Sequence, residues 1–478
     1  EGGVGVGVGP AERPHSQGGI KEKMVFKFNK NYKKKRGRMD PNTAVNTSAA
    51  ISLVGFGIVI FLLLFLIAKW KWHVFFALLI PIIFFGILPG IQQNNFIDAF
   101  ESGFGNTLGS IGVVIVLGSI IAEALKHTGA IQVITKSMVN LVGTHRMPLA
   151  LTLTGFIIGV AIFSDVAYVI LNPLVHSAAK TMNVGIAVMS TGLVGALQLT
   201  HAIVPPTPGP LAAAAIVGAD IGRTIIFGGI ACLFGSLACW AWGVYFAGPR
   251  IKTMASEEFE GVSIEDLDGE GPVELPSNLS SYAPIVIPIL LIGTQSVISL
   301  VAPEEHILRT IFSYLGWPVV ALSVGVWLAY RNIKNPEDRH KSKDAWVEAA
   351  LRTSAMILVV TGLGGSLSAI LRGTPAVDFI AMIFTDYGLP TILLPFVIGI
   401  IGNMITGSTT VGVITAASLV APMLPNLSLS PEAAMLAGAS GSVIIKYVNS
   451  SYFWVCTSLL NLGVPAAVFS YVGATFVG

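Results

Sequence analysis

One carboxylate lies in a place where a carboxylate is costly. Ser164 and Asp165 interrupt the long apolar stretch 147–182. An ionisable group among residues that enter a membrane is expensive and therefore indicates a functional site. Asp165 could carry a coupling proton, because burial favours the protonated form of a carboxyl group, or it could hydrogen-bond substrate hydroxyls. The structural alternative is a partnership with a buried donor such as His201 or Lys446.

A second polar interruption runs from His201 to Pro210 and contains Thr207 and four prolines within six residues. Proline removes backbone donors and disrupts helices, and broken backbone in lipid is tolerated only inside protein or beside a cavity. We therefore expect a broken helix whose freed N-terminus directs a partial positive charge at an anion. A plain loop is the alternative, but the flanking apolar residues are too few for two full spans.

A third polar interruption divides the apolar stretch 389–424. Its amide and hydroxyl groups suit a sugar acid and, together with backbone carbonyls, would also suit Na⁺. A helix contact rich in Ser and Thr is the alternative interpretation. The candidate residues are Asn403, Thr406, Ser408, Thr409 and Thr410.

A fourth interruption follows near the C-terminus and contains Lys446, Asn449 and Ser450. The Lys446 ammonium group is a candidate partner for a substrate carboxylate. The alternative is that its long side chain extends to the membrane surface.

Composition places these residues in a polytopic membrane protein. Only 11% of the 478 residues are charged, 53% are hydrophobic, and the mean hydropathy is +0.75. A soluble domain carries about 25% charged residues. A secreted disulfide scaffold, a disordered chain and a nucleic-acid-binding protein are therefore excluded. The three cysteines lie in apolar runs and are expected to be small buried hydrophobic residues.

Candidate membrane spans are apolar stretches near the required length of about 20 residues. They are 49–68, 73–91, 109–126, 221–248, 282–302, 306–330, 346–371 and 455–476. No group of His, Cys or acidic residues has metal-ligand spacing, and no Gly-Lys-Ser/Thr nucleotide motif is present. We therefore expect no metal, no cofactor and no ATP-driven pump.

The two halves of the chain are related in sequence. Residues 118–134 align with residues 364–380 at an offset of 246, and the polar interruptions recur at matching places. Each half contains a long helix followed by an amphipathic stretch, an apolar hairpin and a broken helix. The last three elements are 131–142, 147–182 and 184–218 in the first half, and 376–386, 389–424 and 431–476 in the second. If the hairpins re-enter without crossing, the halves are inverted repeats. This all-α architecture of inverted repeats, two re-entrant hairpins and two broken helices is typical of secondary transporters.

The expected organisation has six parts. Residues 1–48 form a basic, disordered tail, either a membrane-surface segment or a foreign extension before a native start at Met39. The other parts are two scaffold spans (49–95), the first repeat (96–250), an acidic linker (251–281), two connecting spans with a basic loop (282–345), and the second repeat (346–478).

The distribution of basic residues predicts the orientation in the membrane. With ten crossings, 13 of the 18 Lys and Arg residues beyond the tail fall on one face. Since basic loops remain in the cytoplasm, this face is expected to be cytoplasmic and both termini to lie outside.

From about Ala49 to its end, the chain resembles the gluconate permease family of bacterial proton symporters. The segments that carry the resemblance are 106–110, 163–165, 205–210, 407–411, 414–416, 441–443, Asn449 and 453–454. The resemblance implies an inner-membrane location, a homodimer, an elevator in which a transport domain slides against a scaffold, and sugar-acid substrates, with serine carried by some members.

The chain departs from the gluconate-type pattern at informative positions. Asp165 stands where Glu is usual, Thr207 replaces a His, and Asn403 replaces a basic residue. Ser450 replaces an acid, and Lys446 adds a charge nearby. A carboxylate substrate is still expected, but the basic group that pairs with it has a different position.

Together these features predict a homodimeric symporter in the lipid bilayer that takes up a small hydroxylated carboxylate with protons. Asp165 is the expected proton carrier and His201 the second candidate. A Na⁺-coupled or proton-coupled carrier of a hydroxy amino acid such as serine is the main alternative. A passive channel is disfavoured by the two hairpins. A membrane enzyme would need a nucleophile and base at depth, for which Asp165 with His201 is a poor candidate.

Overall fold

The computed structural model describes residues 47–70, 72–87, 93–255, 275–303, 305–334, 336–371, 374, 386, 388–445 and 450–478. These residues form helices, turns and connections, and none of them lies in a β-strand. Residues 51–478 make up one compact unit. Most of the expected tail and of the acidic linker, the stretch 376–385, Lys446 and Asn449 lie outside the described residues.

The described helices have a fixed order along the chain. In chain order they are α2 (Thr47–Ala68), α3 (Val74–Gly86), α4 (Gln93–His127), α5 (Ala130–Val142), α6 (Met147–Ile158), α7 (Ser164–Thr181), α8 (Ile186–Ile203), α9 (Pro208–Val217), α10 (Ile221–Ala241), α11 (Gly248–Arg250), α12 (Asn278–Val301), α13 (Ile307–Leu315), α14 (Pro318–Arg331), α15 (Pro336–Lys341), α16 (Ala345–Leu371), α18 (Leu393–Thr406), α19 (Thr409–Val420), α20 (Pro431–Ile444), α21 (Ser451–Leu459), α22 (Val464–Ala467) and α23 (Gly473–Val477).

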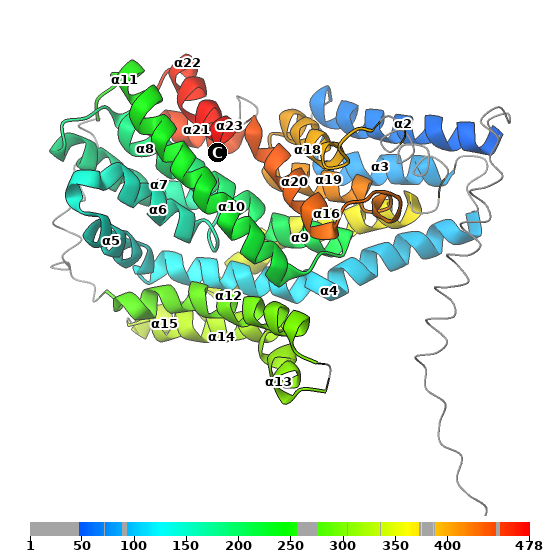
Figure 1. The fold of residues 1–478 in the computed structure, drawn as a ribbon, viewed down its shortest axis with the longest axis horizontal. Coiled ribbons are helices and arrows are strands. Elements are labelled where there is room, and N and C mark those ends of the chain that lie inside the picture. Colours follow the sequence, from blue (N-terminus) through cyan, green and yellow to red (C-terminus); the bar gives the residue numbers. More distant parts are fainter. Residues whose placement is uncertain are drawn as a thin grey trace, which may run out of the picture. The chain divides into compact units, whose positions relative to one another are not determined.

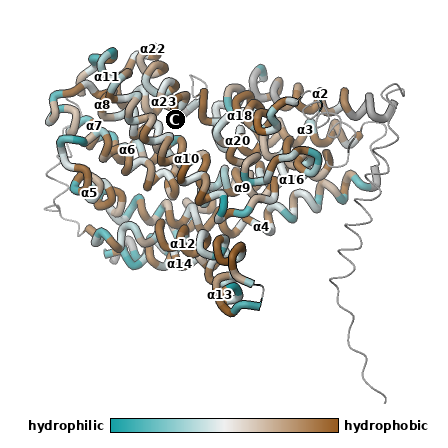
Figure 2. The backbone as a smooth tube through the Cα atoms, in the orientation of Figure 1, coloured by the Kyte–Doolittle hydropathy of each residue, from teal (hydrophilic) through white to brown (hydrophobic). Residues whose placement is uncertain are grey.

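Most of these helices are apolar along their length, as Figure 2 shows. Among the described residues, five helices are long and apolar enough to cross a membrane, and three bent helix pairs would bring the number to eight. The prediction of a polytopic membrane protein is thus supported by helix length as well as by composition. The three cysteines are free and buried, as expected.

Both predicted hairpins form as pairs of helices. The first hairpin consists of α6 and α7, which meet at residues 159–163, and the second of α18 and α19, which meet at Gly407 and Ser408. The broken helix predicted at 184–218 is α8 and α9, with its break at residues 204–207. The amphipathic stretch 131–142 is confirmed as α5.

The order of elements recurs along the chain at a nearly constant spacing. Helices α18, α19, α20 and α21 begin 246, 245, 245 and 243 residues after α6, α7, α8 and α9. The two sets pack against each other: α9 of the first set contacts α19 of the second, and α21 of the second set contacts α7 of the first. The long helices α4 and α16 also pack along each other, with α14 beside α4 (Figure 1).

Two stretches that were predicted as continuous spans are each divided by a bend. The stretch 306–330 is divided into α13 and α14, which are bent by 57°, because Gly316 ends α13 and Pro318 begins α14. The stretch 455–476 is bent by 116°, because Asn461 adopts a positive φ of 51° before the helix restarts. In addition, the predicted span 109–126 is only the second half of the 35-residue helix α4.

Candidate functional site

The site is built around the break between α8 and α9. Helix α8 stops at Ile203 because Val204 is extended, with φ −102° and ψ 119°, and because Pro205 and Pro206 supply no N–H group. Their peptide bond is cis. The Thr207 hydroxyl donates to the Val204 carbonyl oxygen over 2.7 Å. The buried Thr207 side chain therefore satisfies the Val204 carbonyl oxygen within the break.

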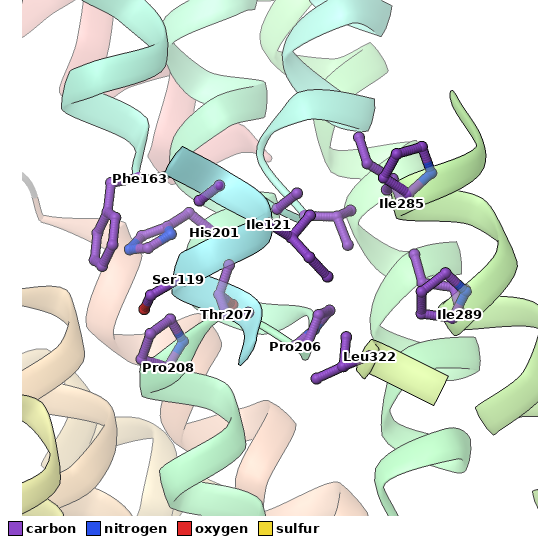
Figure 3. A pocket seen from close by; sticks show the side chains of 16 residues that line it. Ser119, Ile121, Phe163, His201, Pro206, Thr207, Pro208, Ile285, Ile289 and Leu322 are labelled. Carbon is purple, nitrogen blue, oxygen red and sulfur yellow. The ribbon is translucent and has the colours of Figure 1, made fainter. Parts of the chain in front are cut away.

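A cavity opens on one side of this break, between α4, the tip of the first hairpin, α12 and α14. His201, Thr207 and Ser119 supply its polar side chains, and the remaining lining is apolar. The His201 ring lies 5.1 Å from the Phe163 ring, centroid to centroid, whereas Ile285 and Ile289 approach from the opposite wall (Figure 3). The free space between these side chains is about 20 Å³, which is room for about one water molecule.

The second hairpin covers another side of the same break. The buried Gln198 amide of α8 donates to the Thr409 hydroxyl over 2.8 Å. Gly209 of α9 lies so close to Thr410 that an added Cβ atom would be 3.3 Å from the Thr410 Cα atom. Helices α8 and α9 therefore hold the start of α19 between them.

The tip of the second hairpin is stabilised by its own hydroxyl groups. The chain reverses at Gly407, which has a φ of +69° that favours glycine. The Thr406 hydroxyl donates to the Gly402 carbonyl oxygen over 2.8 Å and accepts from the Ser408 amide over 3.1 Å. The Ser408 hydroxyl in turn accepts from the Val411 amide as the N-cap of α19. Thr406 and Ser408 thus shape the turn.

Asn403 connects the second hairpin to the end of α20. Its side chain is fully buried, and its amide donates to the Ile445 carbonyl oxygen over 2.7 Å. Ser450, also buried, is the N-cap residue of α21. The expected break between α20 and α21 is therefore bordered by two predicted site residues.

The first hairpin brings Asp165 into the first turn of α7. The carboxylate is partly exposed and accepts a hydrogen bond from the Val166 amide over 3.0 Å. Among the described residues it forms no ion pair, so the alternative partnership with His201 is not observed. A negative charge is favourable at a helix N-terminus. Ser164 is buried, and neither Ser164 nor Asp165 lines the cavity beside His201.

Four helices, α7, α9, α19 and α21, begin at a hairpin tip or helix break. Their N-termini carry partial positive charge and suit an anion. The donors are unequal, however, since Gly209 alone among the first three residues of α9 has an N–H group. The α9 terminus therefore offers its dipole more than its hydrogen bonds.

The predicted site residues that the structure describes therefore lie at or beside the two hairpin tips and the two helix breaks. One of these places is the α8–α9 break itself, and both hairpin tips adjoin it. Gln198, Ser119 and Phe163 were not predicted. Gln198 precedes His201 by three positions and so shares its helix face, which was the available signal. Among the described residues, no group of three His, Cys, Asp or Glu side chains could hold a metal ion.

Comparison with known proteins agrees with this architecture. The GntP family permease pattern matches residues 51–477. An uncharacterised permease of Haemophilus influenzae is 32% identical over 86% of both chains. The D-serine transporter DsdX of Escherichia coli K12 is 31% identical over 87% of this chain and 93% of its own. The high-affinity gluconate transporter of the same strain is 28% identical over 88% and 94%.

A solved structure shares the fold. The YdaH transporter of Alcanivorax borkumensis superposes with a TM-score of 0.51 at 15% identity, covering 80% of this chain and 88% of that one. Full-length agreement with the family pattern, the apolar helices and the paired hairpins lead to one conclusion: the chain is a multi-pass membrane transport protein, not an enzyme, and belongs to the GntP permease family.

Proposed function

We propose that this protein takes up a small hydroxylated carboxylate by proton symport across the bacterial inner membrane. The observation that carries the proposal is the convergence of polar side chains and helix N-termini at the α8–α9 break. Gluconate and D-serine, named for two relatives, both present a carboxylate beside a hydroxyl group. A helix N-terminus would bind the substrate carboxylate, and the hydroxyl-bearing residues would hydrogen-bond the substrate hydroxyl groups.

In this proposal the substrate lies against the break, between the two hairpin tips. His201 and Thr207 face it from α8 and the break, whereas Thr409 and Thr410 face it from the second hairpin with Asn403, Thr406 and Ser408 holding the tip in shape. Ser164, Lys446, Asn449 and Ser450 complete the set at the first tip and the second break.

Asp165 is the proposed proton carrier and His201 the second candidate. The Asp165 carboxylate lies at a hairpin tip, and its single described hydrogen bond comes from the adjacent Val166 amide. A carboxylate with so few partners can gain and lose a proton without breaking a network. Na⁺ coupling is less favoured, because the Thr406 and Ser408 hydroxyls are already engaged within the second tip.

The transport cycle is proposed to be that of a homodimeric elevator with inverted repeats and no cofactor. The nearly constant spacing between matching helix starts supports the repeat. The contacts of α9 with α19, and of α21 with α7, support one transport unit made from both halves. The cytoplasmic face is proposed to be the one that carries Lys126, Lys136 and Arg250, with both termini outside.

The decisive experiment is uptake of labelled gluconate, and separately of D-serine, into proteoliposomes under an inward proton gradient without Na⁺. Accumulation above equilibrium that collapses with a protonophore would establish proton symport and name the substrate. Accumulation only with a Na⁺ gradient would identify Na⁺, not the proton, as the coupling ion. Equilibration without accumulation would show a passive channel and reject symport.

A further inference from the structure

Helix α7 carries a row of polar residues along one face. Asp165, Tyr168, Asn172, His176 and Lys180 follow one another at spacings of three or four residues. Residues at these spacings lie above one another on the same side of a helix. The row therefore runs the length of α7, from the hairpin tip to its far end.

The middle of this row is buried in protein. Tyr168, Asn172 and His176 are each at most 1% exposed, whereas Lys180 is exposed and Asp165 is partly exposed. Helix α7 packs against α8 and α21, and His176 contacts the end of α21. Both ends therefore reach accessible places while the middle does not.

The polar atoms in the middle have unmet hydrogen-bonding needs. Among the described residues, the Tyr168 hydroxyl and both amide atoms of Asn172 have no hydrogen-bond partner. Each such buried group costs about 1–3 kcal/mol. Phe in place of Tyr168 and Leu in place of Asn172 would fill a similar space without that cost. The free-energy cost of burying the two polar side chains must therefore be offset by other interactions. Buried water, which makes about three hydrogen bonds to such groups, would supply it.

Other polar groups border the row from α21 and the segment after it. The Tyr471 hydroxyl donates to the Cys456 carbonyl oxygen over 3.4 Å. The Tyr452 hydroxyl donates to the Val194 carbonyl oxygen over 3.0 Å. These hydroxyl groups are therefore committed to backbone oxygens, in contrast to the Tyr168 hydroxyl.

His176 continues the row towards the exposed end. Its Nε2 atom lies 2.9 Å from the Leu459 carbonyl oxygen, which holds the imidazole in place against the end of α21. An imidazole can accept a proton on one nitrogen and release one from the other. Lys180, one turn further on, marks the protein surface.

We propose that the row Tyr168–Asn172–His176, with water ordered by Tyr168 and Asn172, conducts the coupling proton between Asp165 and the Lys180 end of α7. This inference rests on the proposed proton symport and adds the route of the proton. The Asp165 carboxylic acid releases its proton to the first water and becomes a carboxylate. His176 takes up a proton from the row as an imidazolium and passes it to bulk water beside Lys180. Lys180 is one of the 13 basic residues on the face predicted to be cytoplasmic, so this end of α7 is the proposed cytoplasmic exit.

The test compares net transport with exchange in proteoliposomes, using whichever of labelled gluconate and D-serine the wild-type protein accumulates. Asn172→Leu and Tyr168→Phe should slow proton-driven accumulation by about 100-fold, the scale of losing a positioned proton-transfer group. Exchange of internal for external substrate should stay near the wild-type rate, because it needs no proton release. Thr154→Val is the matched control: its buried hydroxyl donates to the Ala150 carbonyl oxygen of its own helix, and both activities should persist.

Three outcomes would overturn the proposal. Equal loss of exchange and accumulation would assign Tyr168 and Asn172 a structural role. Unchanged accumulation in both variants would place the proton route elsewhere. A density map that resolves water but shows Asn172 bonded directly to Tyr168, with no water between them, would remove the relay whatever the substrate. Failure of proton symport itself is distinguishable, since the wild-type protein would then show no protonophore-sensitive accumulation.

Discussion

The two hairpins have the same construction but use their polar groups differently. The first tip, residues 159–163, contains only Gly and apolar residues, and its polar groups follow within α7. The second tip is rich in hydroxyl groups, and Thr406 and Ser408 bond to its own backbone. The first hairpin therefore leaves one carboxylate, that of Asp165, partly exposed, whereas the second uses the hydroxyl groups of Thr406 and Ser408 to hold its shape.

This difference agrees with separate proposed tasks for the hairpins. A tip fixed by its own hydrogen bonds would present Thr409 and Thr410 to a substrate in a constant geometry. The first hairpin, with the Asp165 carboxylate in the first turn of α7, is the one proposed to couple transport to protons. We expect changes in the second hairpin to alter folding and affinity, and changes in the first to alter coupling.

The largest expected effect tests how rigidly the second hairpin is held. Gly441 of α20 packs so closely on α18 that a Cβ atom would overlap the Phe396 carbonyl oxygen. Because backbone atoms cannot easily yield, Gly441→Ala should cost about 3 kcal/mol or more and remove most folded protein. Size-exclusion chromatography of the detergent-solubilised variant would measure it. Gly105→Ala, with nothing within 4 Å of the added atom, is the control and should fold normally.

The next effect concerns coupling through the first hairpin. Asp165→Asn keeps the size and polarity of the side chain but cannot carry a proton. We expect proton-driven accumulation to fall by about 100-fold or more, with substrate exchange retained. Proteoliposome uptake and exchange assays measure both quantities.

The control for Asp165→Asn is Asp98→Asn, which makes the same chemical change at an exposed position of α4. It should leave accumulation unchanged. Full proton-driven accumulation in the Asp165 variant would remove Asp165 from the coupling role and would end the proposed division between the hairpins.

Much of this comparison could be predicted from the sequence. Helix breaks depend on local chemistry, so the prolines between His201 and Pro210 placed one break correctly. The polar residues between Asn403 and Thr410 placed the second tip. The hairpins followed because polar residues interrupted the long apolar stretches 147–182 and 389–424 at matching places in the two halves. Asp165 was identifiable for the same reason: a carboxylate among apolar residues is costly.

The partners of these residues could not be predicted. The bond between Gln198 and Thr409 joins residues 211 positions apart, and only tertiary packing brings them together. The hydroxyls of Thr406 and Ser408 were predicted as ligands, but composition alone cannot tell a hydroxyl that faces a substrate from one that caps a helix. The bends in α13–α14 and α21–α22 were missed because the sequence analysis treated 306–330 and 455–476 as continuous spans on hydropathy alone, although Gly316, Pro318 and Asn461 interrupt them.

A smaller effect is expected where the second hairpin meets α8. Thr409→Val leaves the buried Gln198 amide without its acceptor and should cost about 1–3 kcal/mol of stability. Gln198→Leu leaves the Thr409 hydroxyl unpaired at a similar cost. The double variant removes both groups and should be less destabilised than the two single losses added together. Thermal unfolding in detergent gives the three values, and strict additivity would show that the bond does not couple the hairpin to α8.

The smallest expected effect separates shape from contact at the second tip. The Ser408 hydroxyl caps α19, so Ser408→Ala should lower stability by about 1 kcal/mol, and Ser408→Thr, which keeps the oxygen, should restore most of it. The KM for transport should follow the same order with a change of only a few-fold, because the cap acts through the shape of the tip. A KM raised more than about 100-fold, equivalent to about 2.8 kcal/mol, without loss of stability would mean that Ser408 contacts the substrate directly. Both hairpins would then present polar side chains to a ligand or proton. They would differ only in that the first carries the Asp165 carboxylate.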